Sequence, residues 1–384
     1  MTKVENNLKY GMVGGGEGSF IGDVHRKALG LVGKAELVCG CFDINRENNV
    51  LSGLKYGLDE KRIYGSYTEM AEVESSNPDK PDFIIIVTPN ILHFPAAKEF
   101  LSKDFNVICE KPLCFEVEEA EELKRLADEK GLLFGIMYTY IGYPMVKQAR
   151  HMVRGGDIGD ITVVMAEYAQ AWMGELCEKT DGKPAIWRND PKMNGRSGAV
   201  GDIGTHIECA VTYITGLKIA SLCANLRAIG RGTKLDTNAE ILVKYDSGAS
   251  GMYWCSQVAY GHNNGLKIRI FGTKGSIEWE QEDPCKLKVC ILGKPMQILT
   301  QGKDYLSESV RKYCRLPAGH PEGFYEAFAN IYTAFTMALL KQKSGLGITA
   351  QDKDFAGIDE GLSGVRFIDA CVSSSQKNSG WIEY

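Results

Sequence analysis

The sequence has no excess of basic charge and no long uninterrupted apolar segment. Its 384 residues contain 44 Lys and Arg against 49 Asp and Glu, a net charge of −5. It therefore lacks the electrostatic footprint of a protein that binds nucleic acid or an anionic membrane. The uncharged stretch 132–146 is interrupted by Gly135, Gly142 and Pro144, and it is too short to span a bilayer. Because residues 1–10 also lack the apolar core of a signal peptide, we expect a cytoplasmic protein with no nucleic acid and no membrane among its partners.

Cysteine pairs with metal-binding spacing are also missing. The twelve cysteines are scattered along the chain, and no two of them form a CxxC pair, which is the spacing typical of zinc and redox sites. Several, such as Cys39, Cys109 and Cys255, lie within apolar runs. We interpret most of them as small buried hydrophobic residues in a reducing compartment, and we expect no metal site.

The length and composition indicate a globular protein with two domains. Hydrophobic residues make up 44% of the chain and charged residues 24%, which is ordinary for a folded protein and argues against disorder. A chain of this length is expected to form two or three domains, of which two is the simpler interpretation. We place a dinucleotide-binding domain at 1–140 and a domain for substrate binding and oligomerisation at 141–384.

The first segment alternates short apolar runs with longer amphipathic ones. Strands are expected at 8–13, 36–42, 83–87, 106–109 and 132–137, and helices at 21–32, 95–101 and 117–130. The run 83–87 is apolar throughout, as in a strand that is covered on both faces. Strands separated by helices in this way predict a doubly wound parallel sheet, a Rossmann fold.

The second segment is richer in β-forming runs. Strands are expected at 162–170, 219–228, 239–245, 249–257, 266–271, 276–281 and 287–292, and helices at 145–153, 203–215 and 323–341. Short turns between several of these runs favour an antiparallel sheet. The predicted fold class is therefore α/β, with an N-terminal Rossmann domain and a C-terminal α+β domain built on a large, mostly antiparallel open sheet. The segment 172–200 has no clear pattern, and its length marks it as a candidate functional loop.

The second segment contains too few expected helices to cover both faces of such a sheet. We expect the uncovered face to carry apolar side chains such as Ile241, Val243, Met252 and Trp254. An exposed apolar face of this size needs a partner surface, so we expect a homo-oligomer, a dimer or larger.

A glycine-rich turn follows the first expected strand. Gly14 and Gly16 fit the first two positions of the dinucleotide-binding pattern, whereas the third glycine, Gly22, comes three residues later than in GxGxxG. Between a strand and a helix, such glycines let the backbone approach a pyrophosphate, which then faces the N–H groups at the start of the helix. We therefore expect a dinucleotide here, with further contacts from Ser19, Phe20 and Ile21.

Asp43 closes the second expected strand, 21 residues after Gly22. An acidic residue at about this spacing binds the adenosine ribose in dinucleotide-binding domains. Its carboxylate accepts hydrogen bonds from both ribose hydroxyls and repels a 2′-phosphate, so we expect NAD as the cofactor. Arg46 keeps NADP open as an alternative, because a guanidinium there would reach a phosphate.

Polar residues follow two further strands. Thr88, Asn90 and His93 come after the third expected strand, and Glu110 and Lys111 come after the fourth. The carboxyl ends of strands carry the ligand site of a doubly wound sheet. A lysine beside an acid at that edge can donate a hydrogen bond to a substrate oxygen. The alternatives are a surface Lys–Glu pair and a histidine that only stabilises the start of a helix.

The second segment contributes a separate acid–histidine pair. Asp202 and His206 are four residues apart, so on a helix they share one face. The aspartate can orient the imidazole, which then acts as a general base near neutral pH. On its own the pair is also compatible with a structural histidine.

Together these segments resemble the Gfo/Idh/MocA oxidoreductases, named after glucose–fructose oxidoreductase and inositol dehydrogenase. The glycine-rich first turn, TPN-x-x-H at 88–93, EKP at 110–112 and GD-x-G-x-H at 201–206 occur in the order found in that family. The resemblance covers most of the chain. It implies a Rossmann domain that binds NAD and a second domain that binds a small-molecule sugar or glycoside.

The resemblance also implies roles for individual residues. In this family the EKP lysine, here Lys111, contacts the reacting alcohol, and the D-x-x-x-H pair corresponds to Asp202 and His206. Trp187 and Arg188 resemble the family's WR segment, which lies close to the nicotinamide and the substrate. The lengthened turn GGGEGSFIG, followed by DVHR, resembles a sub-group tied to oxidised glycosides, including gut bacterial enzymes that oxidise C-glycosides at C3.

The expected contacts fall into two sets. The cofactor set is Gly14, Gly16, Ser19, Phe20, Ile21, Asp43, Arg46, Thr88, Asn90, His93, Glu110, Lys111, Trp187 and Arg188. The substrate set is Lys111, Tyr143, Trp172, Asp202, Thr205 and His206. Trp172 is suited to stacking on a sugar face, although packing in a core or an interface is the alternative.

We therefore expect hydride transfer between NAD and a secondary alcohol of a sugar, glycoside or cyclitol, with C3 of a glucoside as the finer hypothesis. His206 removes the hydroxyl proton while Asp202 holds its ring, and Lys111 bonds the same oxygen. Two alternatives stay open. One is an NAD-dependent glycosidase that oxidises C3 transiently and eliminates the aglycone. The other is a non-catalytic NAD-binding sensor, which would not need all three residues together.

Overall fold

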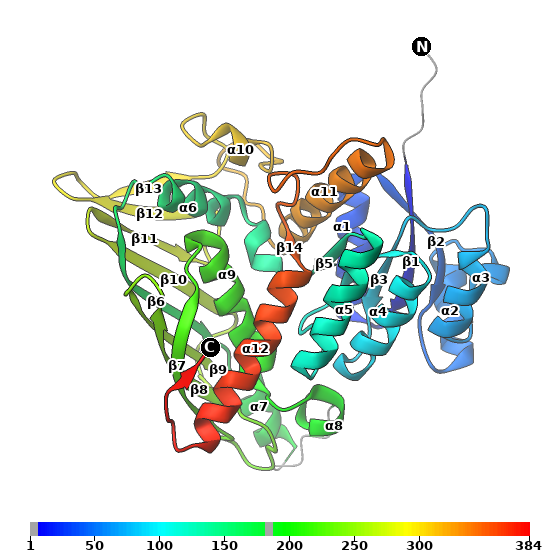
Figure 1. Cartoon of the computed structure of the whole chain (residues 1–384), viewed down its shortest axis with the longest axis horizontal. Helices are drawn as coiled ribbons and strands as arrows, with labels where there is room; N and C mark the ends of the chain where they lie inside the picture. The colour runs from blue at the N-terminus through cyan, green and yellow to red at the C-terminus, as the bar shows by residue number, and fades with distance from the viewer. Residues whose placement is uncertain (1–6, 181–186) are drawn as a thin grey trace. The chain divides into compact units, whose positions relative to one another are not determined.

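The computed structural model describes residues 7–180 and 187–384, which form two compact units (Figure 1). The first unit comprises the described part of Met1–Thr139 together with Phe324–Leu362. The second comprises the described part of Tyr140–Gly323 together with Ser363–Tyr384. The chain thus leaves the first unit and later returns to it with a segment that the sequence had placed in the second domain.

The first unit is built on a six-stranded sheet. Its strand order is β14 (Ala356–Gly357), β5 (Phe134–Ile136), β4 (Asn106–Cys109), β3 (Phe83–Val87), β1 (Leu8–Gly14) and β2 (Ala35–Cys41). The strands β5, β4, β3, β1 and β2 run parallel, and β14 pairs antiparallel with β5. Every side chain of β3 is buried, which is why that run is apolar throughout. The predicted Rossmann sheet is confirmed.

The helices of this unit begin and end at capping residues. They are α1 (Phe20–Val32), α2 (Arg46–Lys55), η1 (Glu60–Arg62), α3 (Tyr67–Ser75), η2 (Asn90–Leu92), α4 (His93–Ser102), α5 (Val117–Lys130), α11 (Phe324–Lys343) and the start of α12 (Ile358–Gln376). Ser19 caps α1 by accepting a hydrogen bond from Gly22 N at 3.2 Å. α1 ends at Gly33 and α5 at Gly131, both at a φ of 63°, a left-handed conformation that favours glycine.

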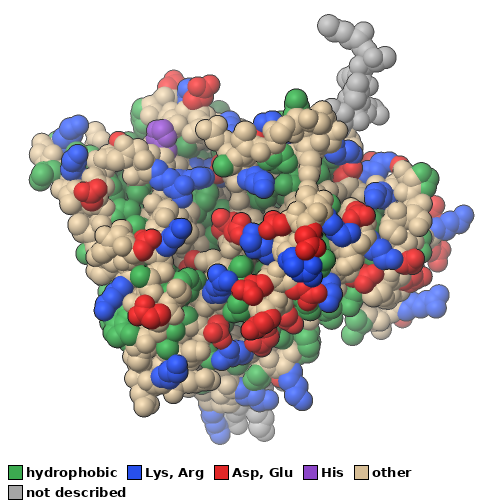
Figure 2. Space-filling model, in the orientation of Figure 1, with side chains coloured by type: hydrophobic (Ala, Val, Ile, Leu, Met, Phe, Trp, Pro, Cys, Tyr) green, Lys and Arg blue, Asp and Glu red, His purple; other side chains and the backbone are tan. Residues whose placement is uncertain are grey.

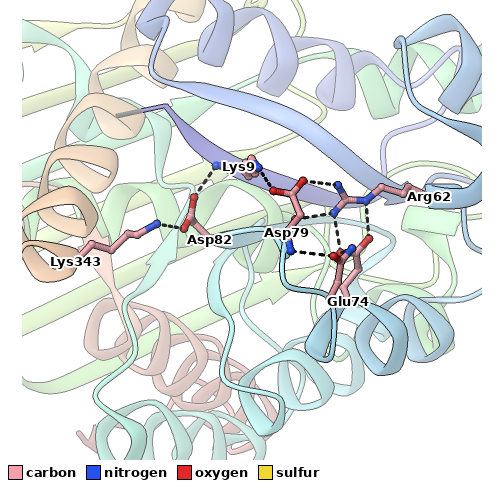
Figure 3. Close-up of polar contacts among 7 residues, drawn as sticks. Lys9, Arg62, Glu74, Asp79, Asp82 and Lys343 are labelled. Carbon is pink, nitrogen blue, oxygen red and sulfur yellow. Dashed lines mark hydrogen bonds and ion pairs between the residues drawn. The ribbon is translucent and has the colours of Figure 1, made fainter. Parts of the chain in front are cut away.

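A network of charged side chains ties the returning segment to the first unit (Figure 3). Lys9 pairs with Asp79, which also pairs with Arg62 at 3.5 Å. The backbone N–H of Lys9 donates to Asp82 Oδ2 at 2.7 Å. Lys343, the last residue of α11, pairs with the other oxygen of Asp82. Asp82 therefore connects the first strand of the sheet to the C-terminal helix of the same unit.

The second unit is built on a nine-stranded sheet. Its order is β13 (Gln297–Thr300), β12 (Lys286–Ile291), β11 (Gly275–Glu280), β10 (Gly265–Gly272), β6 (Ile161–Ala169), β9 (Ser250–Ser256), β8 (Asn238–Tyr245), β7 (Ile219–Arg227) and β15 (Ile382–Glu383). Neighbouring strands are antiparallel except β6 and β9, which are parallel. The prediction of a large, mostly antiparallel sheet is confirmed.

Helices cover one face of this sheet. The second unit contains α6 (Pro144–Arg154), α7 (Trp172–Lys179), η4 (Trp187–Asn189), α8 (Pro191–Asn194), η5 (Val200–Gly204), α9 (Thr205–Thr215), α10 (Glu308–Arg311) and the rest of α12, with η3 (Thr139–Gly142) at its beginning. α6 and α9 pack on the strands. The segment predicted to be a long loop, 172–200, contains α7, η4 and α8, with residues 181–186 outside the described part of the chain.

The residues expected on the uncovered face divide between the two faces. Ile241 and Val243 are each 1% exposed, whereas Leu242 and Met252 are 48% and 46% exposed. The expectation that Ile241 and Val243 lie on the uncovered face is wrong, because successive residues of a strand point to opposite faces. Met252 does lie there, and the half-buried Trp254, two residues further along β9, shares its face.

The surface carries charges of both signs. Figure 2 shows acidic and basic side chains interspersed over α5, where Arg125 and Glu129 pair at 3.0 Å and Lys124 and Asp128 at 2.9 Å.

In residues 7–180 and 187–384, no helix has the length and apolar character needed to cross a membrane. Over the same residues, His, Cys, Asp and Glu side chains form no group of three suited to a metal ion. Seven of the twelve cysteines are buried, as expected for small hydrophobic side chains.

Candidate active site

The strand order of the first unit creates a switch point between β1 and β3. From β1 the chain crosses to β2 on one side, and β3 then pairs with β1 on the other side. Ligands of doubly wound sheets bind at such a point, outside the carboxyl ends of the strands. β1 ends at Gly14, β3 at Val87 and β4 at Cys109. The glycine-rich turn, residues 88–93 and residues 110–112 therefore all begin at this edge of the sheet.

The glycine-rich turn is packed so closely that side chains would not fit. Gly14 has a φ of +80°, and a Cβ there would lie 2.4 Å from the carbonyl oxygen of Val87. A Cβ on Gly22 would lie 2.4 Å from Gly15 Cα. At Gly16 a Cβ would approach the carbonyl oxygen of the residue after β2 to 3.1 Å. The backbone of the turn thus lies against β3 and α1, as a pyrophosphate-binding loop requires.

The start of α1 is accessible. Phe20 is 72% exposed, Ile21 is half-buried, and Ser19 directs its hydroxyl to the backbone of Gly22. An open cavity of about 550 Å³, lined by Ser19 and Phe20 among others, lies beside this turn. Because the first N–H groups of a helix have no intrahelical partner, they bind an anion well. The turn and the helix start therefore fit a dinucleotide.

Arg26 supports the turn from the side of α1. Its Nη1 donates to the carbonyl oxygen of Gly15 at 2.6 Å, and its guanidinium stacks 3.8 Å from the centre of the Tyr56 ring. This contact fixes a carbonyl of the glycine-rich turn. Arg26 belongs to the DVHR segment, but the sequence alone assigned it no role.

Asp43 is held in a turn between β2 and α2. Its Oδ1 accepts a hydrogen bond from Asn45 N at 2.8 Å, and its Oδ2 accepts one from Asn48 Nδ2 at 2.5 Å. Arg46, the first residue of α2, is exposed in the same turn. The carboxylate is thus oriented by its neighbours at the end of β2, where the sequence places a ribose-binding acid.

His93 connects two of the segments that follow strands. Its Nδ1 lies 2.7 Å from Pro112 O, and its Nε2 lies 3.0 Å from Thr88 O. Burial lowers the pKa of His93, although the hydrogen bonds to these two carbonyl oxygens oppose the decrease. Asn90 is buried at the start of η2. His93 therefore joins residues 88–93 to residues 110–112.

Glu110 is the buried partner of a second histidine. His25, on α1, places Nε2 at 2.9 Å from Glu110 Oε1 and Nδ1 at 2.5 Å from the hydroxyl of Tyr332 on α11. The other carboxylate oxygen accepts the backbone N–H of Lys111 at 3.2 Å. Both oxygens of Glu110 are thus engaged within the first unit, and the side chain of Lys111 is half-buried.

In the second unit, Asp202 and His206 lie on consecutive helical elements. Asp202 belongs to the π-helix η5, and His206 lies in the first turn of α9. The sequence predicted a helix over 203–215, which begins one residue after Asp202. π-helical turns occur frequently at functional sites. Gln257 Nε2 donates to Asp202 Oδ2 at 2.8 Å, so the carboxylate is oriented from the end of β9.

Asp236 holds the beginning of η5. Its two oxygens accept the backbone N–H groups of Gly198 and Val200 at 2.8 and 3.0 Å. Burial raises the pKa of Asp236, although these hydrogen bonds oppose the increase. The segment that carries Asp202 and His206 is therefore fixed by a buried acid from outside the helix.

Two tyrosines lie against His206. The ring centres of Tyr140 and Tyr168 lie 4.8 and 6.2 Å from that of His206. Their hydroxyls are hydrogen-bonded to each other, and Tyr168 donates to Asn264 Oδ1 at 2.6 Å. Burial and the neighbouring Tyr140 raise the pKa of Tyr168 well above its ordinary value. The Tyr168 phenol therefore stays protonated, and the two hydrogen-bonded tyrosines lie beside the imidazole.

The remaining predicted substrate residues have different surroundings. Tyr143 is 2% exposed and stacks on Tyr140 with ring centres 6.3 Å apart. Thr205 is fully buried, and its hydroxyl donates to Gly201 O at 3.1 Å. Trp172 is half-buried, and its Nε1 donates to Gln170 Oε1 at 2.9 Å.

The WR pair is more exposed. Trp187 is half-buried, Arg188 is exposed, and the guanidinium lies 4.4 Å from the centre of the indole ring. Both residues belong to η4, directly after the part of the chain that is not described. Their predicted contact with the cofactor stays a prediction.

Several supporting residues carried no recognisable signal. Tyr332 lies 307 residues from His25, and Gln257, Asp236 and Asn264 lie in loops or strand ends without a motif. Among the supporting residues, His25 and Arg26 stood within a segment that the sequence singled out. Supporting residues of this kind depend on tertiary contacts, which a single sequence does not display.

Family models match both halves of the chain. Residues 8–138 match the model of an oxidoreductase family with an NAD-binding Rossmann fold, and residues 146–278 match the GFO/IDH/MocA C-terminal domain. An uncharacterised oxidoreductase of Bacillus subtilis, YfiI, is 36% identical over 99% of this chain and 98% of its own length. Levoglucosan dehydrogenase of Pseudarthrobacter phenanthrenivorans is 26% identical over 74% of this chain and 76% of its own.

Solved structures give the same assignment. The crystal structure of an inositol dehydrogenase homologue from Azotobacter vinelandii, complexed with NAD+, superposes with a TM-score of 0.92 at 34% identity. It covers 100% of this chain and 99% of that one. An oxidoreductase from Sinorhizobium meliloti has a TM-score of 0.88 at 40% identity, with 98% and 99% coverage. The first unit is an NAD-binding Rossmann domain, whose turn and helix start fit that cofactor.

Proposed function

Because the chain belongs to the Gfo/Idh/MocA family of oxidoreductases, we propose that it transfers a hydride between NAD and a secondary alcohol of a sugar, glycoside or cyclitol. The observation that carries the proposal is the presence of two separately supported groups. Lys111 follows β4 at the switch-point edge, and Asp202 and His206 lie on a π-helix and the helix after it. A binding module would need only the first unit's turn.

His206 is the proposed general base. A neutral imidazole takes the proton of the substrate hydroxyl as the C–H bond breaks. Tyr140 and Tyr168 restrict the plane of this ring by their edge and tilted contacts. Asp202, itself oriented by Gln257, stabilises the positive charge that the imidazole gains.

Lys111 is the proposed hydrogen-bond donor to the same hydroxyl oxygen. Its ammonium stabilises the alkoxide character that develops when the proton leaves. Its backbone is fixed by Glu110, and the next residue is held through Pro112 O by His93. The lysine is therefore presented from a rigid segment, as an electrostatic catalyst requires.

The first unit holds the cofactor. Gly14, Gly16 and the start of α1 would receive the pyrophosphate, and Asp43 would bind the adenosine ribose. When bound, NAD supplies the hydride acceptor, and the protein supplies binding, orientation and charge. Arg26 keeps the turn in shape through Gly15 O.

The substrate class is drawn from relatives. Solved structures and curated relatives bear the names inositol dehydrogenase homologue, levoglucosan dehydrogenase and glucose-6-phosphate 3-dehydrogenase. One structure holds NADH and myo-inositol. We propose a cyclic polyol with adjacent hydroxyls as substrate, and C3 of a glucoside as the position oxidised. We also propose that the protein is a dimer or a larger homo-oligomer.

The test is product analysis with the purified protein. It is incubated with NAD and, separately, myo-inositol, levoglucosan, glucose 6-phosphate and an aryl glucoside. We expect NADH absorbance and a product lighter by two hydrogens. Free sugar plus aglycone without net NADH would identify a glycosidase instead. NAD binding without turnover of any of these compounds would contradict the proposed reaction on this substrate class.

A further inference from the structure

A buried histidine that the proposed reaction does not use lies behind Lys111. His25 is 0% exposed and has a hydrogen-bond partner at each ring nitrogen, Glu110 at 2.9 Å and Tyr332 at 2.5 Å. The rings of Phe328 and Tyr332 meet it edge-on, with centres 5.2 and 5.8 Å away. The imidazole is thus hydrogen-bonded at both ring nitrogens and packed against two aromatic rings.

The chemistry of the partners determines which atom donates. An ionised carboxylate only accepts, so Nε2 of His25 carries the proton and donates to Glu110. In the neutral ring Nδ1 is then an acceptor, and the hydroxyl of Tyr332 donates to it. Burial raises the pKa of Tyr332 well above its ordinary value, which keeps the phenol proton in place. The hydrogen bonds therefore run in one direction, from Tyr332 through His25 to Glu110.

Glu110 is the end of the hydrogen-bonded chain that lies next to Lys111. Burial opposes its ionisation, but the hydrogen bond from His25 and the charge of Lys111 hold the pKa of Glu110 below its ordinary value. The oxygen that His25 does not contact accepts the backbone N–H of Lys111. The carboxylate thus holds the backbone of Lys111, and the charge of Lys111 favours the ionised carboxylate.

We propose that Tyr332, His25 and Glu110 form a buried hydrogen-bonded chain that positions Lys111. His93 completes the support, because it holds Pro112 on the other side of Lys111. The inference rests on the proposed function for its catalytic consequence. The hydrogen-bonded chain itself lies entirely within the first unit.

The hydrogen-bonded chain of Tyr332, His25 and Glu110 also gives a reason why the late segment Phe324–Leu362 returns to the first unit. Tyr332 and Phe328 belong to α11, which follows eight of the nine strands of the second sheet in the sequence. A Rossmann domain made only of the N-terminal segment would contain His25 and Glu110 without the hydroxyl donor. The returning helix therefore completes a polar network directly behind the lysine.

Other ionisable groups surround this chain. Cys109 precedes Glu110 on β4, and its thiol lies within the electrostatic range of that carboxylate. The charge of Tyr10 on β1 contributes to the raised pKa of Tyr332. The charges of Glu110 and Lys111 act in opposite directions on the pKa of His93 on α4. Burial raises the pKa of Tyr10 and of Cys109, so both stay neutral near pH 7. Glu110 is therefore the member of this group whose ionised form is favoured.

The first experiment compares two deletions of one buried hydroxyl. Tyr332→Phe removes the donor to His25, and Tyr64→Phe is the matched control, because Tyr64 is a buried tyrosine of the same unit whose hydroxyl donates to Glu74 at 2.8 Å. We expect both variants to lose similar thermal stability. Only Tyr332→Phe should lower kcat, by roughly threefold to tenfold for one hydrogen bond, with the Kd for NAD unchanged. Equal kcat in the two variants would overturn the proposal.

The second experiment does not depend on turnover. Hydrogen exchange of the Lys111 backbone N–H, mapped by peptide mass spectrometry, is compared in the wild type and in Glu110→Ala. We expect faster exchange at Lys111 than at the neighbouring strand β3 in the variant, because this N–H loses its acceptor. Unchanged exchange at Lys111 would overturn the positioning role. If the wild type oxidises no polyol, the proposed function fails, whereas this measurement still decides the inference.

The direction of the chain has its own readout. The protein contains six histidines, so selective ¹⁵N labelling gives few ring signals, and the spectrum of His25→Gln identifies those of His25. We expect a protonated Nε2 and a hydrogen-bonded, unprotonated Nδ1, with Nδ1 shifted in Tyr332→Phe. A ring protonated only at Nδ1 would overturn the assignment.

Discussion

Lys111 and His206 belong to different units, and each unit supports its own residue. Glu110 and His93 hold the segment around Lys111, whereas Tyr140 and Tyr168 pack on His206. The cofactor-binding turn depends on neither residue. Binding of NAD and activation of the alcohol are therefore separable at the level of single side chains.

Substitution of the two residues tests this separation. Lys111→Ala and His206→Ala should retain NAD and lose hydride transfer, because each is proposed to act on the hydroxyl. A general base contributes about 10²–10⁴-fold, so the loss in His206→Ala should fall in that range. The double variant should be little slower than the slower single variant. Single-turnover reduction of bound NAD gives these rates.

Two outcomes would contradict this division of roles. A wild-type rate in His206→Ala would make His206 structural and assign the proton to Lys111 or a tyrosine. Loss of NAD from both variants would show that the residues maintain the cofactor site.

Asp43 is expected to set the choice between NAD and NADP. Asp43→Asn keeps an acceptor for the Asn45 N–H but removes the charge that repels a 2′-phosphate. The preference for NAD should fall by about tenfold or more, since charge-assisted hydrogen bonds are roughly twice as strong as neutral ones. Separate titrations with NAD and NADP measure it.

The matched control is Asp59→Asn in the same unit. Asp59 also accepts a backbone N–H two residues on, from Lys61 at 3.0 Å, but it lies at the start of η1. Its substitution should leave both affinities unchanged. Equal affinity of the wild type for the two cofactors would contradict the role of Asp43.

Motifs made the reactive residues predictable, but not the residues that support them. Lys111, Asp202 and His206 stand in short patterns whose order resembles the family. His25 and Tyr332 meet across 307 residues, and no local pattern encodes such a contact. The residues proposed to touch the reactants were thus accessible from sequence, and the residues that support them were not.

At the scale of elements, the glycine-rich turn packs so closely against α1 that one added methyl group should disturb it. Gly22→Ala would place Cβ at 2.4 Å from Gly15 Cα, a backbone atom that cannot move away alone. Overpacking of this kind costs about 1–3 kcal/mol, and the displaced turn should also weaken NAD binding. Urea unfolding and an NAD titration measure the two effects.

Gly30→Ala is the control on the same helix. Gly30 is exposed near the end of α1, and a Cβ there would meet nothing within 4 Å. The substitution should stabilise the protein by about 0.5–1 kcal/mol, because alanine is the better helix former. It should leave NAD binding unchanged. A Gly22→Ala variant as stable as the wild type would contradict the close packing.

Elements with a strong local pattern were predicted within a few residues. The apolar run of β3 and the glycine-capped α5 have the expected bounds. The helices α2 and α3 were missed, because both are polar and carry only a weak apolar stripe. The π-helix η5 was also missed, since Asp236 imposes it through tertiary contacts.

At the scale of the whole molecule, the buried Glu110 links folding to pH. Its pKa in the folded state lies below the ordinary value, which is about 4.3 for an unperturbed glutamate. Its contribution to stability is therefore complete above that pH and is lost as the pH falls through the lower, folded-state pKa. Urea midpoints between about pH 7 and pH 3 should fall toward acid, and Glu110→Gln should reduce this fall. An identical acid dependence in the variant would contradict the pKa shift.

The uncovered face of the nine-stranded sheet is expected to join copies of the chain. Leu242 and Met252 are directly opposite each other on β8 and β9, and both are about half exposed. A paired lysine substitution, Leu242→Lys with Met252→Lys, would place two like charges on this face and should dissociate the oligomer into particles of 42.3 kDa. Val73→Lys is the control, because Val73 is 49% exposed on α3 of the other unit. Light scattering at micromolar concentration measures the mass, and a wild type that scatters as a single chain would contradict the expectation.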